Sequence, residues 1–364
     1  MPMKVLISGG GTGGHIFPAL SIADEIKRRH PDADIRFVGA LGRMEMERVP
    51  AAGYPIVGLP VAGFDRKRLW RNIPVLFKLW KSMRIARRIV KEFAPDIAVG
   101  VGGYASGPTL KAAQRRGVPT LLQEQNSYAG VTNKLLAAKA RKICVAYPDM
   151  ERFFPADRIV MTGNPIRASL LGSSLTRREA KIKLGFDPDR KLVVALGGSL
   201  GARTINESIE AALPTLRKEG ASLLWQTGRL YIDGCSPAVE SDESFKAVAF
   251  VDDMGAAYRA ADLIVARAGA GTISEIQNLG CPAILIPSPN VAEDHQRRNA
   301  EALANRDAAV MILDADAVAE LPAAIASLLD DSDRRRRIAE AAATMALTDS
   351  AAKIADQIES IVTK

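Results

Sequence analysis

A histidine directly follows a glycine-rich turn near the start of the chain. The segment SGGGTGGHIFP runs from Ser8 and places His15 immediately after five glycines and a threonine. Imidazole titrates near neutral pH, and glycines let backbone N–H groups approach a ligand, so His15 is a candidate general base. The alternative is that His15 only caps or packs against the start of the following helix. Glu124 is a second candidate, either as the base or as the group that orients His15.

Three more glycine turns follow apolar runs in the same way, at residues 100–104, 197–202 and 268–272. Each is expected at the carboxyl end of a strand and the start of a helix, where backbone N–H groups and the helix dipole favour an anion. One such turn is weak evidence, because it can serve helix packing alone, but four predict a site for phosphates, most naturally a diphosphate. Glu275 lies about one turn into the last of these helices, where it could accept ribose hydroxyls or merely favour the dipole.

The first turn also matches the dinucleotide-binding pattern G-x-G-x-x-G through Gly9, Gly11 and Gly14. A dinucleotide site also needs an acidic residue near the carboxyl end of the second strand, to bind the ribose. Residues 35–43 contain none, and Asp32 and Asp34 lie at the opposite end of that strand. A nicotinamide- or flavin-dependent oxidoreductase is therefore disfavoured, and no cofactor is expected.

Short apolar runs alternate with helical patterns along the whole chain, which is typical of parallel sheets built from βαβ units. The expected strands are 5–8, 35–38, 97–101, 120–122 and 142–145, then 192–196, 222–225, 263–266, 283–286 and 309–313. A turn-rich segment around Gly163, Asn164 and Pro165 separates the two groups. We therefore expect an α/β protein of two doubly wound Rossmann-like domains, 1–163 and 164–364, facing across a cleft. The last helix could pack back on the first domain instead of staying with the second.

Charge is distributed unevenly along the 364 residues. Residues 1–165 hold 26 Lys and Arg against 13 Asp and Glu, a net of +13, and the remainder holds 23 against 28, a net of −5, which together give +8. The first half is thus expected to meet an anionic partner. No signal peptide and no membrane-spanning run are expected, and Cys144, Cys235 and Cys281 are too far apart for a metal site.

Residues 66–91 contain ten Lys and Arg and no acidic residue. On a helical projection one face carries Leu76, Leu79, Met83, Ala86 and Val90, and the other carries Lys78, Lys81, Arg84, Arg88 and Lys91. Phe77, Trp80 and Ile85 fall among the cations, which favours a helix resting on an anionic membrane surface. The alternatives are a core helix covered by its neighbours, or a nucleic-acid surface, for which no recognised motif is present.

Eight ordered motifs carry a family resemblance over essentially the whole chain: GGTGGHIFP, GVGGYASGP, QEQNSYAGVTNK, GNPIR, GGSLGA, FVDDM, AGAGTISE and DHQRRNA. They resemble the peptidoglycan glycosyltransferases of the GT-B superfamily. The resemblance implies inverting transfer of GlcNAc from UDP-GlcNAc to the C4 hydroxyl of MurNAc in undecaprenyl-pyrophosphoryl-MurNAc-pentapeptide. This is the lipid I to lipid II step of cell wall synthesis. It also implies a peripheral protein on the cytoplasmic face of the bacterial inner membrane, with an anionic membrane surface and no nucleic acid as partner.

The resemblance also assigns substrate-binding positions in this chain, with the acceptor in the first domain and the donor in the second. They are Thr12, Gly13 and Gly14 at the donor; Asn126 at the GlcNAc hydroxyls; Arg167, Val251 and Met254 around the uracil; Ser199, Ala270, Gly271 and Thr272 at the diphosphate, with Ile273 and Ser274 beside them; Glu275 at the ribose; and His295 and Gln296 at the sugar.

Two residues depart from the family pattern. Gln123 replaces a histidine often found before Glu-Gln-Asn, so no base is assigned there, and Leu200 replaces a common glutamine. No divalent metal is expected, because a helix N-terminus can stabilise the leaving diphosphate and the Asp-x-Asp triplets look like surface acids.

Other interpretations are a UDP-GlcNAc 2-epimerase, another GT-B transferase, or a non-catalytic membrane adaptor. The basic first half disfavours the epimerase, which needs no lipid acceptor. The intact His15 and fourth glycine turn disfavour the adaptor.

Overall fold

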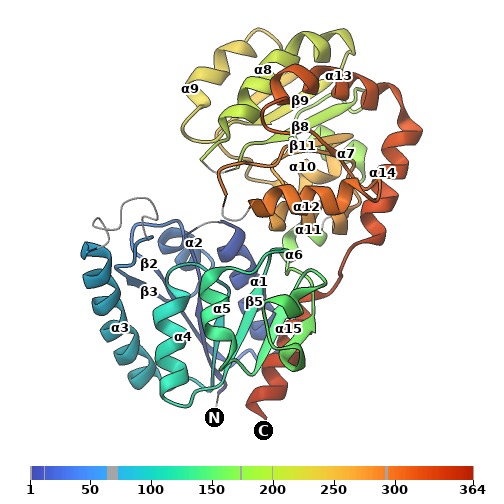
Figure 1. Cartoon of the computed structure of the whole chain (residues 1–364). Coiled ribbons are helices and arrows are strands. Elements are labelled where there is room, and N and C mark those ends of the chain that lie inside the picture. Colours follow the sequence, from blue (N-terminus) through green and yellow to red (C-terminus); the bar gives the residue numbers. More distant parts are fainter. Residues whose placement is uncertain are drawn as a thin grey trace. The chain divides into compact units, whose positions relative to one another are not determined.

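The computed structural model of the chain describes residues 2–11, 13–63, 73–172, 174–198, 200–291 and 294–363, with no side-chain description at 73, 168 and 169. The chain forms two compact units (Figure 1). Unit 1 comprises Met1–Arg167 and Leu347–Lys364, and unit 2 comprises Ala168–Ala346. The division thus falls a few residues after the expected one, and the C-terminal segment belongs to unit 1.

Unit 1 is built on a sheet of parallel strands in the order β3-β2-β1-β4-β5-β6-β7, seven among the described residues. Its central strands are continuous buried apolar runs, as expected when helices cover both faces. The strands are β1 Lys4–Ser8, β2 Asp34–Ala40, β3 Ile56–Leu59, β4 Ile97–Gly100, β5 Thr120–Glu124, β6 Lys142–Val145 and β7 Ile159–Met161.

Two hydrophobic layers cover the faces of this sheet. Helices α1 (Gly13–Arg29), α2 (Glu45–Ala51) and α15 (Ser350–Val362) contribute to one layer. Helices α3 (Ile73–Phe93), α4 (Ser106–Arg115) and α5 (Val131–Ala137) contribute to the other. The remaining elements are the short 3-10 turns η2 (Met150–Arg152) and η3 (Ala156–Arg158).

Unit 2 repeats this architecture with a parallel sheet in the order β10-β9-β8-β11-β12-β13, six strands among those described. Its strands are β8 Leu192–Leu196, β9 Ser222–Gln226, β10 Phe245–Val248, β11 Leu263–Ala266, β12 Ala283–Leu285 and β13 Val310–Met311. The order reverses between β8 and β11, so the loops after these two strands are expected to form the ligand-binding edge.

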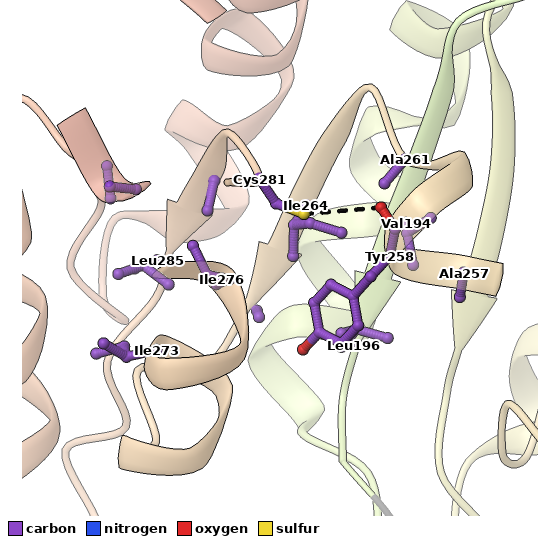
Figure 2. Packing of buried hydrophobic residues seen from close by; sticks show 14 of the residues in the cluster. Val194, Leu196, Ala257, Tyr258, Ala261, Ile264, Ile273, Ile276, Cys281 and Leu285 are labelled. Carbon is purple, nitrogen blue, oxygen red and sulfur yellow. Dashed lines mark hydrogen bonds between the residues drawn. The ribbon is translucent and has the colours of Figure 1, made fainter. Parts of the chain in front are cut away.

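The helices of unit 2 also form two layers. One hydrophobic cluster joins one face of the sheet to α7, α10, α11, α12 and α14, and Figure 2 shows part of it around Tyr258 and Cys281. A second cluster joins the other face to α8 and α13. The bounds are α6 Ala168–Leu171, α7 Arg177–Lys183, α8 Arg203–Lys218, α9 Ile232–Cys235, η4 Ser236–Ala238, α10 Met254–Ala260, α11 Ala270–Leu279, α12 His295–Ala304, α13 Ala317–Asp330 and α14 Ser332–Thr344.

The basic segment forms α3 over most of its length, and its residues 66–72 lie outside the described part. The predicted apolar face is buried only in the second half of the helix, at Ala86 and Val90, whereas Leu76 is exposed. Phe77 is 71% exposed and Trp80 60% exposed, so neighbours of the described chain do not cover them. Ile85 differs, because it packs against the core of unit 1. In the described part of the chain no helix is both long and apolar enough to cross a membrane.

Candidate active site

The first two glycine turns of unit 1 contact each other through their backbones. A Cβ at Gly103 would lie 2.2 Å from the carbonyl oxygen of Gly10, so only glycine permits this approach. Gly103 also has a φ of +84°, in the left-handed region. The Ser106 hydroxyl donates to the carbonyl oxygens of Ser8 (2.6 Å) and Gly102 (2.9 Å), which fastens the second turn to β1.

His15 lies in the first turn of α1, and its imidazole packs on the second glycine turn. A Cβ at Gly102 would be 2.8 Å from its Cδ2 and 2.9 Å from its Nε2. The same position would be 3.8 Å from Oε1 of Gln125, on the segment after β5. His15 is half-buried. Its imidazole therefore lies where the loops after β1, β4 and β5 come together, with Gly13 and Gly14 directly before it in α1.

Glu45 is a functional candidate that the motifs did not single out. Its carboxylate accepts hydrogen bonds from the backbone N–H of Gly11 (3.0 Å) and of Ala40 (2.9 Å), and its side chain is fully buried. Cβ atoms at Gly10 or Gly39 would collide with it. The second strand itself lacks a carboxylate at its end, as expected, but α2 brings one beneath the first glycine turn. The Gly11 N–H already has the Glu45 side chain as its acceptor, and the same side chain ties the first glycine turn to β2 through Ala40.

Glu124 ends β5 and holds the loop that follows it. One carboxylate oxygen accepts from the backbone N–H of Asn126 (3.1 Å) and from its side-chain amide (3.3 Å). The other accepts from the Gly130 N–H and from Asn133 Nδ2, both at 2.9 Å. Burial raises the pKa of Glu124, and these donors partly oppose that shift. These hydrogen bonds position the loop of Asn126. Both predicted roles of Glu124, as the base or as the group that orients His15, stay predictions.

Gln123 and Asn164 connect β5 to the segment that leaves unit 1. Gln123 is fully buried, and its Nε2 donates to Asn164 Oδ1 at 2.9 Å. Asn164 Nδ2 donates to the carbonyl of Gln125 at 3.0 Å. Gln123, at the position where the family often has a histidine, is thus an uncharged residue that links β5 to Asn164. Arg167, expected near the uracil, lies with its guanidinium 4.6 Å from the ring centroid of Phe17 on α1.

In unit 2 the third and fourth glycine turns follow the central strands β8 and β11. Gly198 and Gly201 have positive φ, and a Cβ at Gly201 would lie 2.4 Å from the carbonyl oxygen of Thr227. The fourth turn is the first turn of α11, with Gly269 before it. Apart from its chain neighbours and its own helix backbone, no described atom lies within 4 Å of the position of a Cβ at Gly271, so this helix start is open on that side. Leu200, the second departure, is exposed.

Glu275 on α11 is held by a tyrosine that the motifs did not indicate. The buried Tyr258 hydroxyl on α10 donates to Glu275 Oε2 at 2.7 Å. Figure 2 shows the Tyr258 ring among the apolar side chains between α10 and α11, and the Cys281 thiol donates to its backbone carbonyl. A buried aromatic partner fixes the direction of a carboxylate that is itself half-buried.

Several predicted contacts of unit 2 have side chains turned into its core. Ile273 is fully buried, and Val251 and Ser274 are buried too. The backbone N–H of Val251 donates to Gln226 Oε1 at 2.9 Å. Met254 begins α10, and Asp253 caps that helix by accepting from the N–H of Ala256. Ala270 is buried and Thr272 is half-buried in the first turn of α11.

Helix α12 brings the last two predicted residues to the same edge of the unit 2 sheet. His295 is its first residue, and Gln296 Oε1 accepts from the backbone N–H of Ser288, after β12, at 2.9 Å. Asn299 Nδ2 donates to the carbonyl of Ala268 at 3.3 Å, which fastens α12 to the fourth glycine turn.

Arg267 precedes the fourth glycine turn and pairs with Asp314, of one Asp-x-Asp triplet. Asp314 also accepts from the Thr204 hydroxyl at 3.0 Å. That acid is thus part of an ion pair and is not a free surface acid. Thr12 and Ser199 lie outside the described residues. Among the residues that are described, no cluster of His, Cys, Asp and Glu could hold a metal ion.

Comparison with known proteins decides the family. The N-terminal domain of glycosyltransferase family 28 matches residues 5–145, and its C-terminal domain matches residues 192–358. A protein of Phocaeicola vulgatus named UDP-N-acetylglucosamine–N-acetylmuramyl-(pentapeptide) pyrophosphoryl-undecaprenol N-acetylglucosamine transferase is 55% identical over 100% of this chain and 97% of the relative. The chain belongs to the MurG family, within glycosyltransferase family 28.

Solved structures agree with this family assignment. The crystal structure of MurG from Acinetobacter baumannii matches with a TM-score of 0.76 and 28% identity, over 99% of this chain and 100% of that one. The two parallel Rossmann-like sheets thus form a GT-B fold, as expected. A UDP-GlcNAc 2-epimerase from Neisseria meningitidis, bound to UDP-GlcNAc, shares the fold with a TM-score of 0.68 but only 13% identity.

Proposed function

We propose that the chain transfers GlcNAc from UDP-GlcNAc to undecaprenyl-pyrophosphoryl-MurNAc-pentapeptide, which converts lipid I to lipid II in peptidoglycan synthesis. Full-length identity of 55% to a transferase of that name carries the proposal. The supporting geometry is a pair of Rossmann-like units, each with glycine turns at the carboxyl edge of its sheet.

His15 takes the proton of the acceptor in this proposal. The C4 oxygen of MurNAc attacks C1 of GlcNAc as the bond from C1 to the diphosphate oxygen breaks, so the linkage inverts and UDP leaves with the bonding electrons. The hydroxyl proton passes to the imidazole of His15, which the first two glycine turns hold at the edge of the sheet. The loop of Asn126, held by Glu124, supplies a side-chain amide for sugar hydroxyls.

Unit 2 binds the donor. The open first turn of α11 suits a diphosphate, because helix N-termini stabilise negative charge, including the charge that develops on departing UDP. Glu275, four residues after Gly271, accepts hydrogen bonds from the ribose hydroxyls, and the Tyr258 hydroxyl sets the direction of its carboxylate. His295 and Gln296 at the start of α12 face the sugar in this proposal. Val251 has a buried side chain and an N–H bonded to Gln226, so it offers the uracil only its backbone carbonyl.

The experiment for His15 is a His15→Ala variant assayed for acceptor-dependent UDP release. General-base loss lowers kcat by about 10²- to 10⁴-fold, with donor binding retained. Turnover near the wild-type level, with donor bound normally, would eliminate His15 as the base.

Membrane association is also part of the proposal. The first half of α3 exposes Leu76, Phe77 and Trp80 beside cations, and the Arg84 guanidinium lies 4.8 Å from the Trp80 ring centroid. Cations beside exposed aromatics favour an anionic lipid surface at the cytoplasmic face of the membrane, where the acceptor lies.

Replacement of both Phe77 and Trp80 by Ser tests this surface. We expect weaker binding to vesicles that contain anionic lipid, with an unchanged unfolding transition, because neither side chain packs in a core. Equal vesicle binding by the wild type and the variant would refute the interface.

A further inference from the structure

An apolar groove lies on the helical face of unit 1, between the first half of α3, the start of α4 and α5. Its volume is about 740 Å³. The side chains that give it its character are Val75, Leu79, Met83, Pro108, Val131 and Leu135. Leu135 is 75% exposed, and Val131 and Leu79 of the same lining are exposed too; a contiguous exposed apolar patch of this kind marks a site for a ligand or partner.

One end of the groove is formed by the second glycine turn. Tyr104 directly follows Gly102 and Gly103, lines the groove and is 55% exposed. Its ring lies across the segment after β3, since a Cβ at Gly63 would be 2.6 Å from its hydroxyl oxygen. The groove therefore begins where the turn that supports His15 ends.

Helix α4 forms one long wall of the groove, from Gly107 to Arg115, which is a length of about 12 Å at the rise of an α-helix. Lys111 and Arg115 are the cations of this wall, and α3 adds exposed cations around Phe77 and Trp80. An apolar channel bordered by cations suits an apolar chain attached to an anionic group or emerging from an anionic surface. It suits an acidic or phosphorylated peptide poorly, because the lining offers few hydrogen-bonding groups.

We propose that this groove binds the first isoprene units of the acceptor's polyprenyl chain. The inference rests on the proposed function, in which that chain is joined to the acceptor sugar through a diphosphate. An acceptor whose sugar lies at His15 carries its chain toward Tyr104, at the mouth of the groove. The enzyme thus recognises the lipid directly, in addition to meeting it at the membrane surface.

The test compares two soluble acceptors that carry either a dimethylallyl or a farnesyl chain on the MurNAc-pentapeptide pyrophosphate. Initial rates are measured below the micelle concentration, without detergent or vesicles, so that membrane binding cannot contribute. Burial of the additional isoprene carbons predicts a kcat/KM at least about tenfold higher for the farnesyl acceptor.

Gly107→Leu is the sharpest variant, because it fills the groove. Outside its own helix backbone, a Cβ at Gly107 meets only Thr132 Cγ2, at 3.7 Å among the described atoms, so the leucine side chain extends into open space. We expect the farnesyl preference to fall to about twofold or less. Leu135→Asn, at the exposed rim, is expected to lower it in part without a change in the first turn of α4.

Ile182→Asn is the matched control, since Ile182 is an exposed apolar residue of α7 in unit 2. It should leave the farnesyl preference unchanged. The double replacement of Phe77 and Trp80 by Ser should also leave this ratio unchanged in solution, because neither residue lines the groove.

Equal kcat/KM values of the wild type for the two acceptors would overturn the groove as a lipid site while leaving the transferase intact. A preserved preference in both Gly107→Leu and Leu135→Asn would do the same. Absence of transfer to either acceptor would overturn the proposed function itself, and the inference with it.

Discussion

Tyr258 is the residue whose contribution to donor binding can be isolated most cleanly. Its hydroxyl donates to Glu275 at 2.7 Å, while its ring packs in the core of unit 2. Tyr258→Phe removes only the hydroxyl and frees the Glu275 side chain, so we expect the KM for UDP-GlcNAc to rise about 5- to 30-fold, because fixing that side chain again costs about 1–2 kcal/mol of rotamer entropy. The KM for the acceptor should not change.

A double-mutant cycle with Glu275→Gln separates positioning from a general loss of stability. If Tyr258 acts through Glu275, the two substitutions together raise the donor KM little more than Glu275→Gln alone. Additive effects, or an equal rise in the KM for both substrates, would contradict the positioning role.

Residue types and spacing single out His15 and Glu275 as candidates because each lies at a fixed offset from a glycine turn, and their roles stay predictions. Glu45 and Tyr258 could not be found in this way. Glu45 acquires its role only when α2 folds back under the first glycine turn, between Gly10 and Gly39. Tyr258 lies on a helix that precedes its partner by a strand and a loop. Only the tertiary contacts reveal such roles.

At the scale of elements, every strand expected from an apolar run is present, and the three strands that were missed among the described residues are sheet edges. They are β3, β7 and β10, which end the two sheet orders. Central strands such as β4 and β8 are buried at every position, whereas β7 has no fully buried residue. Strands β3 and β7 are apolar, but at four and three residues they are too short for an apolar run to distinguish a strand from other structure, and Lys246 interrupts β10.

The C-terminal helix α15 is an element whose docking rests on charge as well as on apolar packing. Ile354, Ala355 and Ile358 are buried in unit 1, and Arg29 of α1 pairs with Asp356 (2.6 Å) and Glu359 (3.2 Å). Arg29→Met should reduce the free energy of unfolding of unit 1 by about 1–2 kcal/mol. It should also speed amide hydrogen exchange in 350–362, which deuterium uptake measures directly.

Arg28→Met is the control on the same helix. Arg28 is mostly exposed and pairs with Glu25 of its own helix, so its replacement should leave exchange in α15 unchanged. Equal protection of α15 in the wild type and the Arg29→Met variant would show that apolar packing alone holds the helix.

At the scale of the whole molecule, the sequence predicted two Rossmann-like domains and a basic first half, and the structure has two such units. The motifs and the charge difference are local or additive properties, so they can be predicted without knowledge of the packing. The extension of unit 1 by its C-terminal helix could be offered only as an option, because apolar residues at helical spacing do not specify which surface they cover.

The central claim is that the two units together carry out a glycosyl transfer. UDP-GlcNAc and a short-chain prenyl-pyrophosphoryl-MurNAc-pentapeptide are incubated with the full chain, and the product is analysed by mass spectrometry and by the anomeric proton coupling in NMR. We predict one added N-acetylhexosamine per acceptor, in a β linkage, with one UDP released per transfer. Acceptor-independent formation of free sugar or of a 2-epimer, with the acceptor unchanged, would contradict the claim.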